Sequence, residues 1–245
     1  MRFLLIALLF STSLAHAASP KAEAFAPLFE LAGIRLLCEQ TAPLVQRGLS
    51  DKQQAQLAKV FAADGLCLDL AKKLTGKLDQ AQLVQAKSLL ESPLAQGFTA
   101  AERAVGEGGA DGLAAYRKQL GERPPREERL ALVRRLDAAA HTTTLATLLR
   151  YEVGKTQAFL ALQGRGESID EKALSTQTKA QEDALRASSA QAVESFMLYA
   201  YRQMPSEKLA EYAALYEQPA VAQLLDSSVQ VLPELFAARR AQLKK

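Results

Sequence analysis

Few side chains of this chain have the chemistry needed for metal binding. Its 245 residues include two histidines and two cysteines, and one histidine lies in the N-terminal leader described below. The remaining three are His141, Cys38 and Cys67. A zinc site needs three or four Cys, His or carboxylate ligands at characteristic spacing. These three residues show no such spacing, so the sequence predicts no metal centre.

Catalytic motifs are equally sparse. His141 precedes the threonines of residues 142–144, and a hydroxyl nucleophile needs a base that a third group orients. Adjacent helix positions do not provide this geometry, so we interpret His141 as a cap or hinge. A dinucleotide-binding loop follows a strand, whereas no strand precedes the glycine-rich run of residues 106–112. We therefore predict no cofactor. Carboxylate pairs such as Glu127–Glu128 are typical of solvated helix faces, although an enzyme whose carboxylates converge only in the fold stays open.

The first 17 residues have the form of a secretory signal. Arg2 supplies a positive start, residues 3–10 are apolar, and residues 15–17 form an A-x-A cleavage site. The apolar run is shorter than the about 20 residues that span a bilayer, and no later segment is apolar for that length. We predict cleavage after Ala17 and a periplasmic protein with no transmembrane segment in the mature chain.

Cys38 and Cys67 would then lie in an oxidising compartment. An even number of cysteines in an exported chain favours a disulfide, which would stabilise the fold by roughly 3–4 kcal/mol for a loop of this size. Two buried free thiols are the alternative. A redox-active pair is less favoured, because the C-x-x-C spacing that lowers a thiol pKa is absent.

The composition is that of an ordinary globular protein, with 49% hydrophobic residues and a net charge of +3. Such values exclude a disordered chain. A nucleic-acid-binding domain usually shows a basic stripe and a higher pI than the 8.8 of this chain. We therefore predict no nucleic-acid partner.

Apolar residues recur at three and four positions, and no segment alternates with period two, so we predict an all-α fold. Pro27 and Pro43 should bend or shorten the first helix, and a break is expected near His141. Gly121, Pro124 and Pro125 suggest a boundary between two helical halves, residues 18–120 with the disulfide and residues 121–245. A single domain is the alternative. The predicted helices cover residues 20–48, 50–62, 65–76, 79–91, 93–105, 111–120, 125–162, 168–203, 205–217 and 219–243.

Two segments share a pattern of capped helix, proline and second helix, which predicts helix–Pro–helix hairpins and two duplicated halves. Identical residues recur 126 positions apart (209 − 83), without a gap: Leu83/Leu209, Leu89/Leu215, Glu91/Glu217 and Pro93/Pro219. With the signal sequence and the helical body, this pattern resembles the DUF2059 family of exported bacterial proteins of unknown function. The residues that carry the resemblance, about 40 in extent, include Leu83, Leu90, Ser92 and Pro93 in the first copy and Leu209, Tyr212, Leu215, Tyr216 and Pro219 in the second. It implies an all-helical exported protein and transfers no catalytic residue.

Tyrosines gather at the second hairpin, where Tyr212, Tyr216 and Pro219 form a candidate interaction surface. Tyrosine presents an apolar face and a polar tip, which suits protein interfaces. The i, i+4 spacing of the two tyrosines suits burial against the last helix equally well. We predict a non-enzymatic protein that binds an unknown periplasmic protein or maintains the envelope. A carrier of an apolar ligand between helical hairpins is the alternative, beside an enzyme with an unrecognised carboxylate site.

Overall fold

A computed structural model describes residues 19–107 and 110–243 of the chain. Every regular element within these ranges is a helix, which confirms the all-α prediction. The predicted signal of residues 1–17 and the middle of the glycine-rich connector, residues 108–109, lie outside the described residues. Among the described helices, none combines the length and apolarity needed to cross a membrane.

The helices follow one another with short connections and agree with most of the predicted ranges. They are η1 (Ala22–Phe25), α1 (Ala26–Leu31), α2 (Ile34–Val45), α3 (Asp51–Val60), α4 (Ala63–Leu74), α5 (Gln80–Leu90), α6 (Pro93–Glu107), α7 (Ala110–Glu122), α8 (Glu127–Ala140), α9 (Thr142–Gly164), α10 (Glu171–Thr178), η2 (Lys179–Gln181), α11 (Glu182–Ala200), α12 (Ser206–Tyr216) and α13 (Pro219–Ala241).

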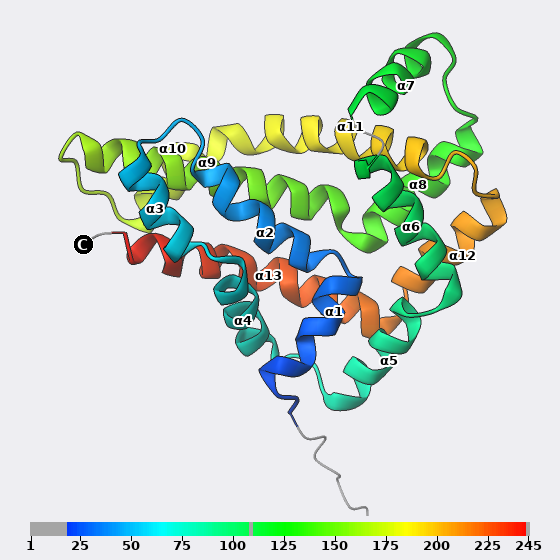
Figure 1. The fold of residues 1–245 in the computed structure, drawn as a ribbon, viewed down its shortest axis with the longest axis horizontal. Coiled ribbons are helices and arrows are strands. Elements are labelled where there is room, and N and C mark those ends of the chain that lie inside the picture. The colour runs from blue at the N-terminus through cyan, green and yellow to red at the C-terminus, as the bar shows by residue number, and fades with distance from the viewer. Residues whose placement is uncertain (1–18, 108–109, 244–245) are drawn as a thin grey trace, which may run out of the picture.

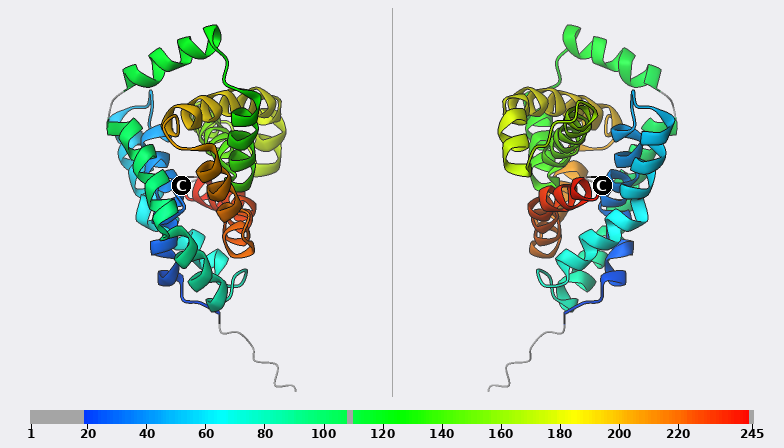
Figure 2. Two further views of the ribbon diagram at one scale, coloured as in Figure 1. Left: turned by 90° about the vertical axis from the view of Figure 1, so that its right-hand side faces the viewer. Right: turned by 90° about the vertical axis from the view of Figure 1, so that its left-hand side faces the viewer.

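The helices form two layers (Figure 1). In the side views, α1 to α6 lie in one layer and α8 to α13 in the other, while α7 crosses the top between them (Figure 2). α13 packs against α4 and α5 of the first layer and against α9 of its own layer. One face of α13 is buried in the core and is apolar apart from Ser228: Val221, Leu224, Leu225, Ser228, Leu232, Leu235 and Phe236. Residues of both proposed halves therefore share one hydrophobic core.

Two predicted long helices are broken, and both predictions were wrong for local reasons. The predicted helix of residues 20–48 is broken at Gly33, whose φ of 72° favours glycine. Pro43, which we expected to bend or shorten this helix, lies inside α2. Residues 168–203 are interrupted by the short 3-10 helix η2. The break at His141 is confirmed, since this residue has a φ of 53° between α8 and α9.

Both helix–proline corners are present in the fold. α5 is followed by α6, which begins at Pro93, and α12 is followed by α13, which begins at Pro219. Leu83 and Leu209 occupy corresponding places in α5 and α12, with exposed fractions of 3% and 0%. The shared pattern is consistent with a duplication, which remains a prediction.

Candidate functional site

The two cysteines lie side by side at the contact between α2 and α4. Their sulfur atoms are 2.7 Å apart and share a hydrogen bond. This distance is longer than the about 2.05 Å of a disulfide bond, and both residues are free thiols in this structure. The packing of α2 against α4 therefore brings the two cysteines together, and the disulfide itself stays a prediction.

The guanidinium of Arg35 lies near this pair. The Arg35 guanidinium donates to Asp64 Oδ1 at 2.6 Å and to Glu39 Oε1 at 2.8 Å. The pKa of Cys67 is lowered by its hydrogen bond with Cys38 and, against the effect of burial, by the nearby Arg35. The hydrogen bond to Cys67 and burial raise the pKa of Cys38. The two thiols are therefore chemically unequal.

The tyrosine corner is part of the core, which corrects the proposed interaction surface. Tyr212 and Tyr216 are 2% and 8% exposed, and their hydroxyl groups lie 3.3 Å apart. Tyr212 stacks on Phe98 of α6 with ring centroids 4.2 Å apart. Of the three predicted surface residues, Pro219 alone is exposed. The aromatic rings fill the space between α6, α11 and α12. Burial of their apolar faces stabilises the fold by more than exposure of their hydroxyl groups to water would.

Glu102 of α6 extends this aromatic cluster with a partly buried carboxylate. It accepts a hydrogen bond from the Tyr201 hydroxyl group. Burial raises the pKa of Glu102 above its usual value, although the Tyr201 hydrogen bond and Arg103 act in the opposite direction. The folded protein therefore binds this proton more tightly than the unfolded chain does.

We expect Glu102→Gln to become increasingly more stable than the wild type as the pH rises from about 4.5 towards 7. A raised carboxyl pKa contributes stability that is fully present below the unfolded pKa and is lost as the pH rises through the folded pKa. Urea unfolding across this pH range measures the difference. The exposed Glu91, paired with Lys87, provides a control as Glu91→Gln. A difference between Glu102→Gln and wild type that does not change with pH would contradict this account.

A buried ion cluster connects α9, α10 and α13, and the sequence analysis missed it. Arg240 Nη2 lies 2.6 Å from Glu171 Oε1, and its Nη1 lies 2.6 Å from Glu152 Oε2. Lys155 Nζ donates to the same Glu171 oxygen at 2.7 Å. The side chains of Glu152, Lys155 and Arg240 are at most 5% exposed. Local spacing gives no sign of this cluster, because the partners of Arg240 lie about 70 and 90 positions earlier in the chain (240 − 171 = 69; 240 − 152 = 88).

The two carboxylates of this cluster differ in their protonation equilibria. Burial raises the pKa of Glu152 despite Arg240 and Lys155. Burial also acts on Glu171, but hydrogen bonds from Arg240 and Lys155 outweigh it and lower its pKa. Glu152 Oε2 receives no well-aligned hydrogen bond from the described residues, so its contact with Arg240 is an ion pair. Mutual charge compensation makes this cluster a structural clamp.

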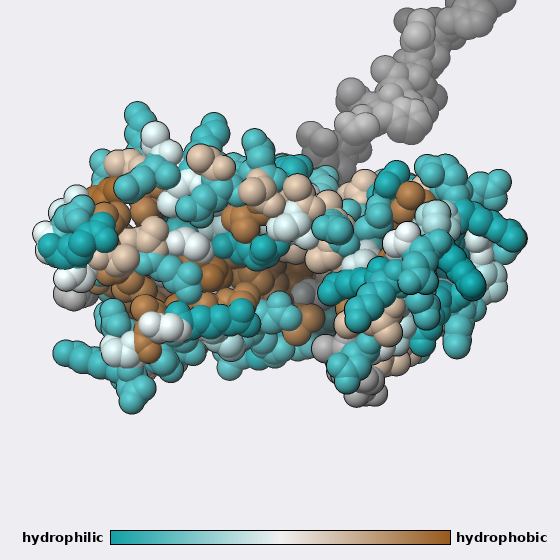
Figure 3. Space-filling view, turned by 90° about the horizontal axis from the view of Figure 1, so that it is seen from above, coloured by the Kyte–Doolittle hydropathy of each residue, from teal (hydrophilic) through white to brown (hydrophobic). Residues whose placement is uncertain are grey.

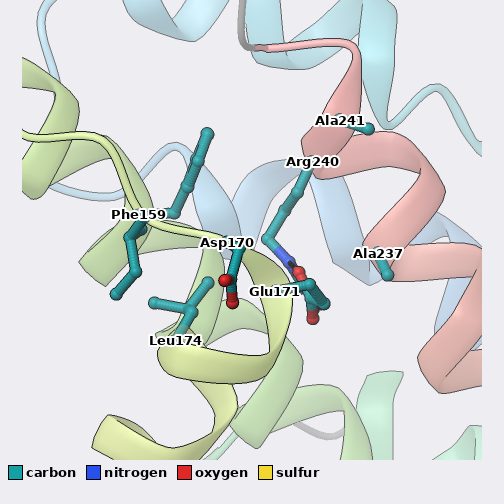
Figure 4. A pocket seen from close by; sticks show the side chains of 8 residues that line it. Phe159, Asp170, Glu171, Leu174, Ala237, Arg240 and Ala241 are labelled. Carbon is teal, nitrogen blue, oxygen red and sulfur yellow. Dashed lines mark hydrogen bonds and ion pairs between the residues drawn. The ribbon is translucent and has the colours of Figure 1, made fainter.

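A small pocket adjoins the clamp. Figure 4 shows Arg240 and Glu171 pointing toward each other beside Phe159 and Leu174. The pocket has a volume of about 60 Å³, which is room for a few water molecules. It is too small for the ligand of a carrier protein.

A larger feature is an open furrow between the two layers, in which apolar side chains gather on the face seen in Figure 3. Arg150 and Gln157 define which side of α9 faces it. Arg150 Nη1 donates to Ser188 Oγ of α11 at 2.7 Å, and Gln157 Nε2 donates to the Leu44 carbonyl of α2 at 3.3 Å. Residues seven apart lie on one helix face, so this face of α9 lies between α2 and α11.

Small residues occupy the same face of α9. Ala146, Gly154 and Ala161 follow the i, i+4 positions of Arg150 and Gln157. A Cβ atom on Gly154 would find only Gln181 Oε1 within 4 Å, at 3.9 Å. Glycine in a helix interior costs about 1 kcal/mol relative to alanine, and the packing seen here does not require it. This face of α9 therefore leaves space beside Gly154 for a close approach by another molecule.

Comparison of the chain with protein-family models, curated proteins and solved structures finds no match. The resemblance to the DUF2059 family therefore remains a prediction. Within residues 19–107 and 110–243, no group of three or more His, Cys, Asp or Glu side chains is arranged to hold a metal ion.

Proposed function

We propose that the protein is an exported binding protein that holds an apolar segment of a partner polypeptide in the furrow. The observation that carries this proposal is the gathering of apolar side chains in the hollow between the two layers (Figure 3). Apolar surface of this kind, bordered by polar residues, marks interaction sites. The leader sequence supports a periplasmic location for the partner.

The shape and chemistry of the furrow favour a helical or extended peptide segment. An amphipathic helix binds such a groove by placing its apolar face on the floor. Gly154 and the neighbouring alanines allow a partner backbone to approach closely. Arg150 and Gln157 lie on the same face and offer polar groups to a partner. A carrier of an apolar small molecule is the second candidate, because the same apolar floor suits an acyl chain.

Filling the furrow tests this proposal. We expect Gly154→Leu to weaken binding of an apolar fluorescent probe, anilinonaphthalene sulfonate, at least tenfold, a loss of about 1.4 kcal/mol. It should also abolish capture of the periplasmic partner. Because leucine is a better helix former than glycine, the melting temperature should not fall.

Gly97→Leu is the matched control. Gly97 lies in the interior of α6, and a Cβ atom there would meet no atom within 4 Å. This variant should bind the probe and the partner as the wild type does. Equal binding by both variants would contradict a site on this face of α9. Loss of a co-purifying lipid in Gly154→Leu, with no captured polypeptide in the wild type, would favour the carrier.

A further inference from the structure

We propose that Cys67 and Cys38 form a reversible thiol–disulfide exchange site, in which Cys67 is the attacking cysteine and Cys38 the resolving one. The proposal is independent of the furrow. It rests on the arrangement of three side chains at the contact of α2 and α4: two cysteines in contact and one arginine beside the more exposed sulfur.

Burial distinguishes the two cysteines. Cys67 is 9% exposed and Cys38 is 1% exposed, so a disulfide-containing reagent reaches Cys67 first. The 2.7 Å contact between the sulfur atoms places Cys38 within reach of any adduct formed on Cys67. The difference in solvent exposure therefore predicts that Cys67 reacts before Cys38.

The surrounding charges act on both cysteines, and their pKa values still shift in opposite directions, upward for Cys38 and downward for Cys67. Arg35 favours the thiolate of either cysteine, and its guanidinium is hydrogen-bonded to Glu39 and Asp64, with Glu30 at 3.8 Å. The carboxylates hold Arg35 in place. Glu30 opposes formation of the Cys67 thiolate, and Glu39 opposes formation of the Cys38 thiolate. The net effect on Cys67 is a lowered pKa, from its hydrogen bond with Cys38 and from Arg35. Cations next to a thiol activate it in this way without a C-x-x-C motif. Arg35 is a positioning residue, because it acts through the Cys67 sulfur.

The reaction needs a disulfide of low molecular weight, such as oxidised glutathione, as the oxidant. The Cys67 thiolate attacks one sulfur of that disulfide, and a mixed disulfide forms while one thiolate leaves and takes a proton from water. Cys38 loses its proton to solvent and attacks Cys67 Sγ, which breaks the mixed disulfide. The Cys38–Cys67 bond forms and the second thiolate leaves. Two cysteine thiols are oxidised and one external disulfide is reduced to two thiols.

Mapping the mixed disulfide in the reduced wild type tests the order of attack. With oxidised glutathione and an acid quench, mass spectrometry should find the transient adduct on Cys67. Cys38→Ser should react with dithiobis(nitrobenzoate) at least tenfold faster than Cys67→Ser. Adducts on Cys38, or equal rates for the two variants, would overturn the assignment.

Arg35→Gln tests the role of the cation. The pH midpoint of the reaction rate of Cys38→Ser should rise when Arg35→Gln is added, and it should not move when Arg134→Gln is added. Arg134 pairs with Glu194 on the other layer, so it controls for loss of a surface ion pair. An unchanged midpoint with Arg35→Gln excludes the positioning role. A Cys38–Cys67 bond that excess reduced glutathione does not reopen would show a permanent structural disulfide and overturn reversible exchange.

Discussion

Replacing Tyr212 with alanine should lower the free energy of unfolding by about 3–5 kcal/mol, as truncation of a large buried aromatic side chain does. Tyr212 stacks on Phe98 and meets the edges of Tyr201 and Tyr216, so alanine leaves a cavity shared by three elements. For a chain of this length, the melting temperature should fall by roughly 6–20 °C. Thermal and urea unfolding measure the change.

Tyr212→Phe is the control for this prediction. It keeps the stacked ring and removes only the hydroxyl contact with Tyr216, so the cost should be about 0.5–1.5 kcal/mol. A wild-type melting temperature for Tyr212→Ala, together with lost partner binding, would show that the ring serves an interface instead of the core. Because the Tyr212 ring is buried, we expect Tyr212→Ala to lose stability.

Arg240→Met should also destabilise the fold by about 3–5 kcal/mol, because it leaves the buried Glu152 carboxylate with Lys155, 3.6 Å away, a cation that Glu171 shares. The contacts of Arg240 with Glu152 and Glu171 connect the end of α13 to α9 and α10. We therefore expect the loss to be cooperative across the second layer. Urea unfolding measures the free energy, and hydrogen exchange in α10 and α13 reports where the structure opens.

Arg134→Met provides the matched control, since Arg134 forms an exposed ion pair with Glu194. Exposed pairs contribute about 0–1 kcal/mol, so this variant should unfold almost as the wild type does. Adding Glu152→Gln to Arg240→Met should restore part of the lost stability, because the buried charge is then absent. Equal costs for the two arginine variants would contradict a clamp formed by the buried cluster.

The helices were predictable from sequence because their determinants are local. The capping box at Asp79, in which Gln82 N donates to the Asp79 carboxylate at 2.8 Å, depends on residues three apart. Proline begins α6 and α13, and Leu83 and Leu209 lie on the buried faces that the spacing predicted. The hinge at His141 was also expected from the interrupted pattern.

Tertiary packing decided the environment of each chemical group. Nothing near Cys67 in sequence predicts the Arg35 guanidinium, which arrives because α2 and α4 pack together. The i, i+4 spacing of Tyr212 and Tyr216 fitted either a surface or a core, and Phe98 of α6 made it core. Arg240 lies near the end of the last helix, and its carboxylate partners come from α9 and α10, far away in the sequence. Local spacing determines which face of a helix is apolar, whereas burial, charge pairing and thiol reactivity depend on contacts between residues far apart in the chain.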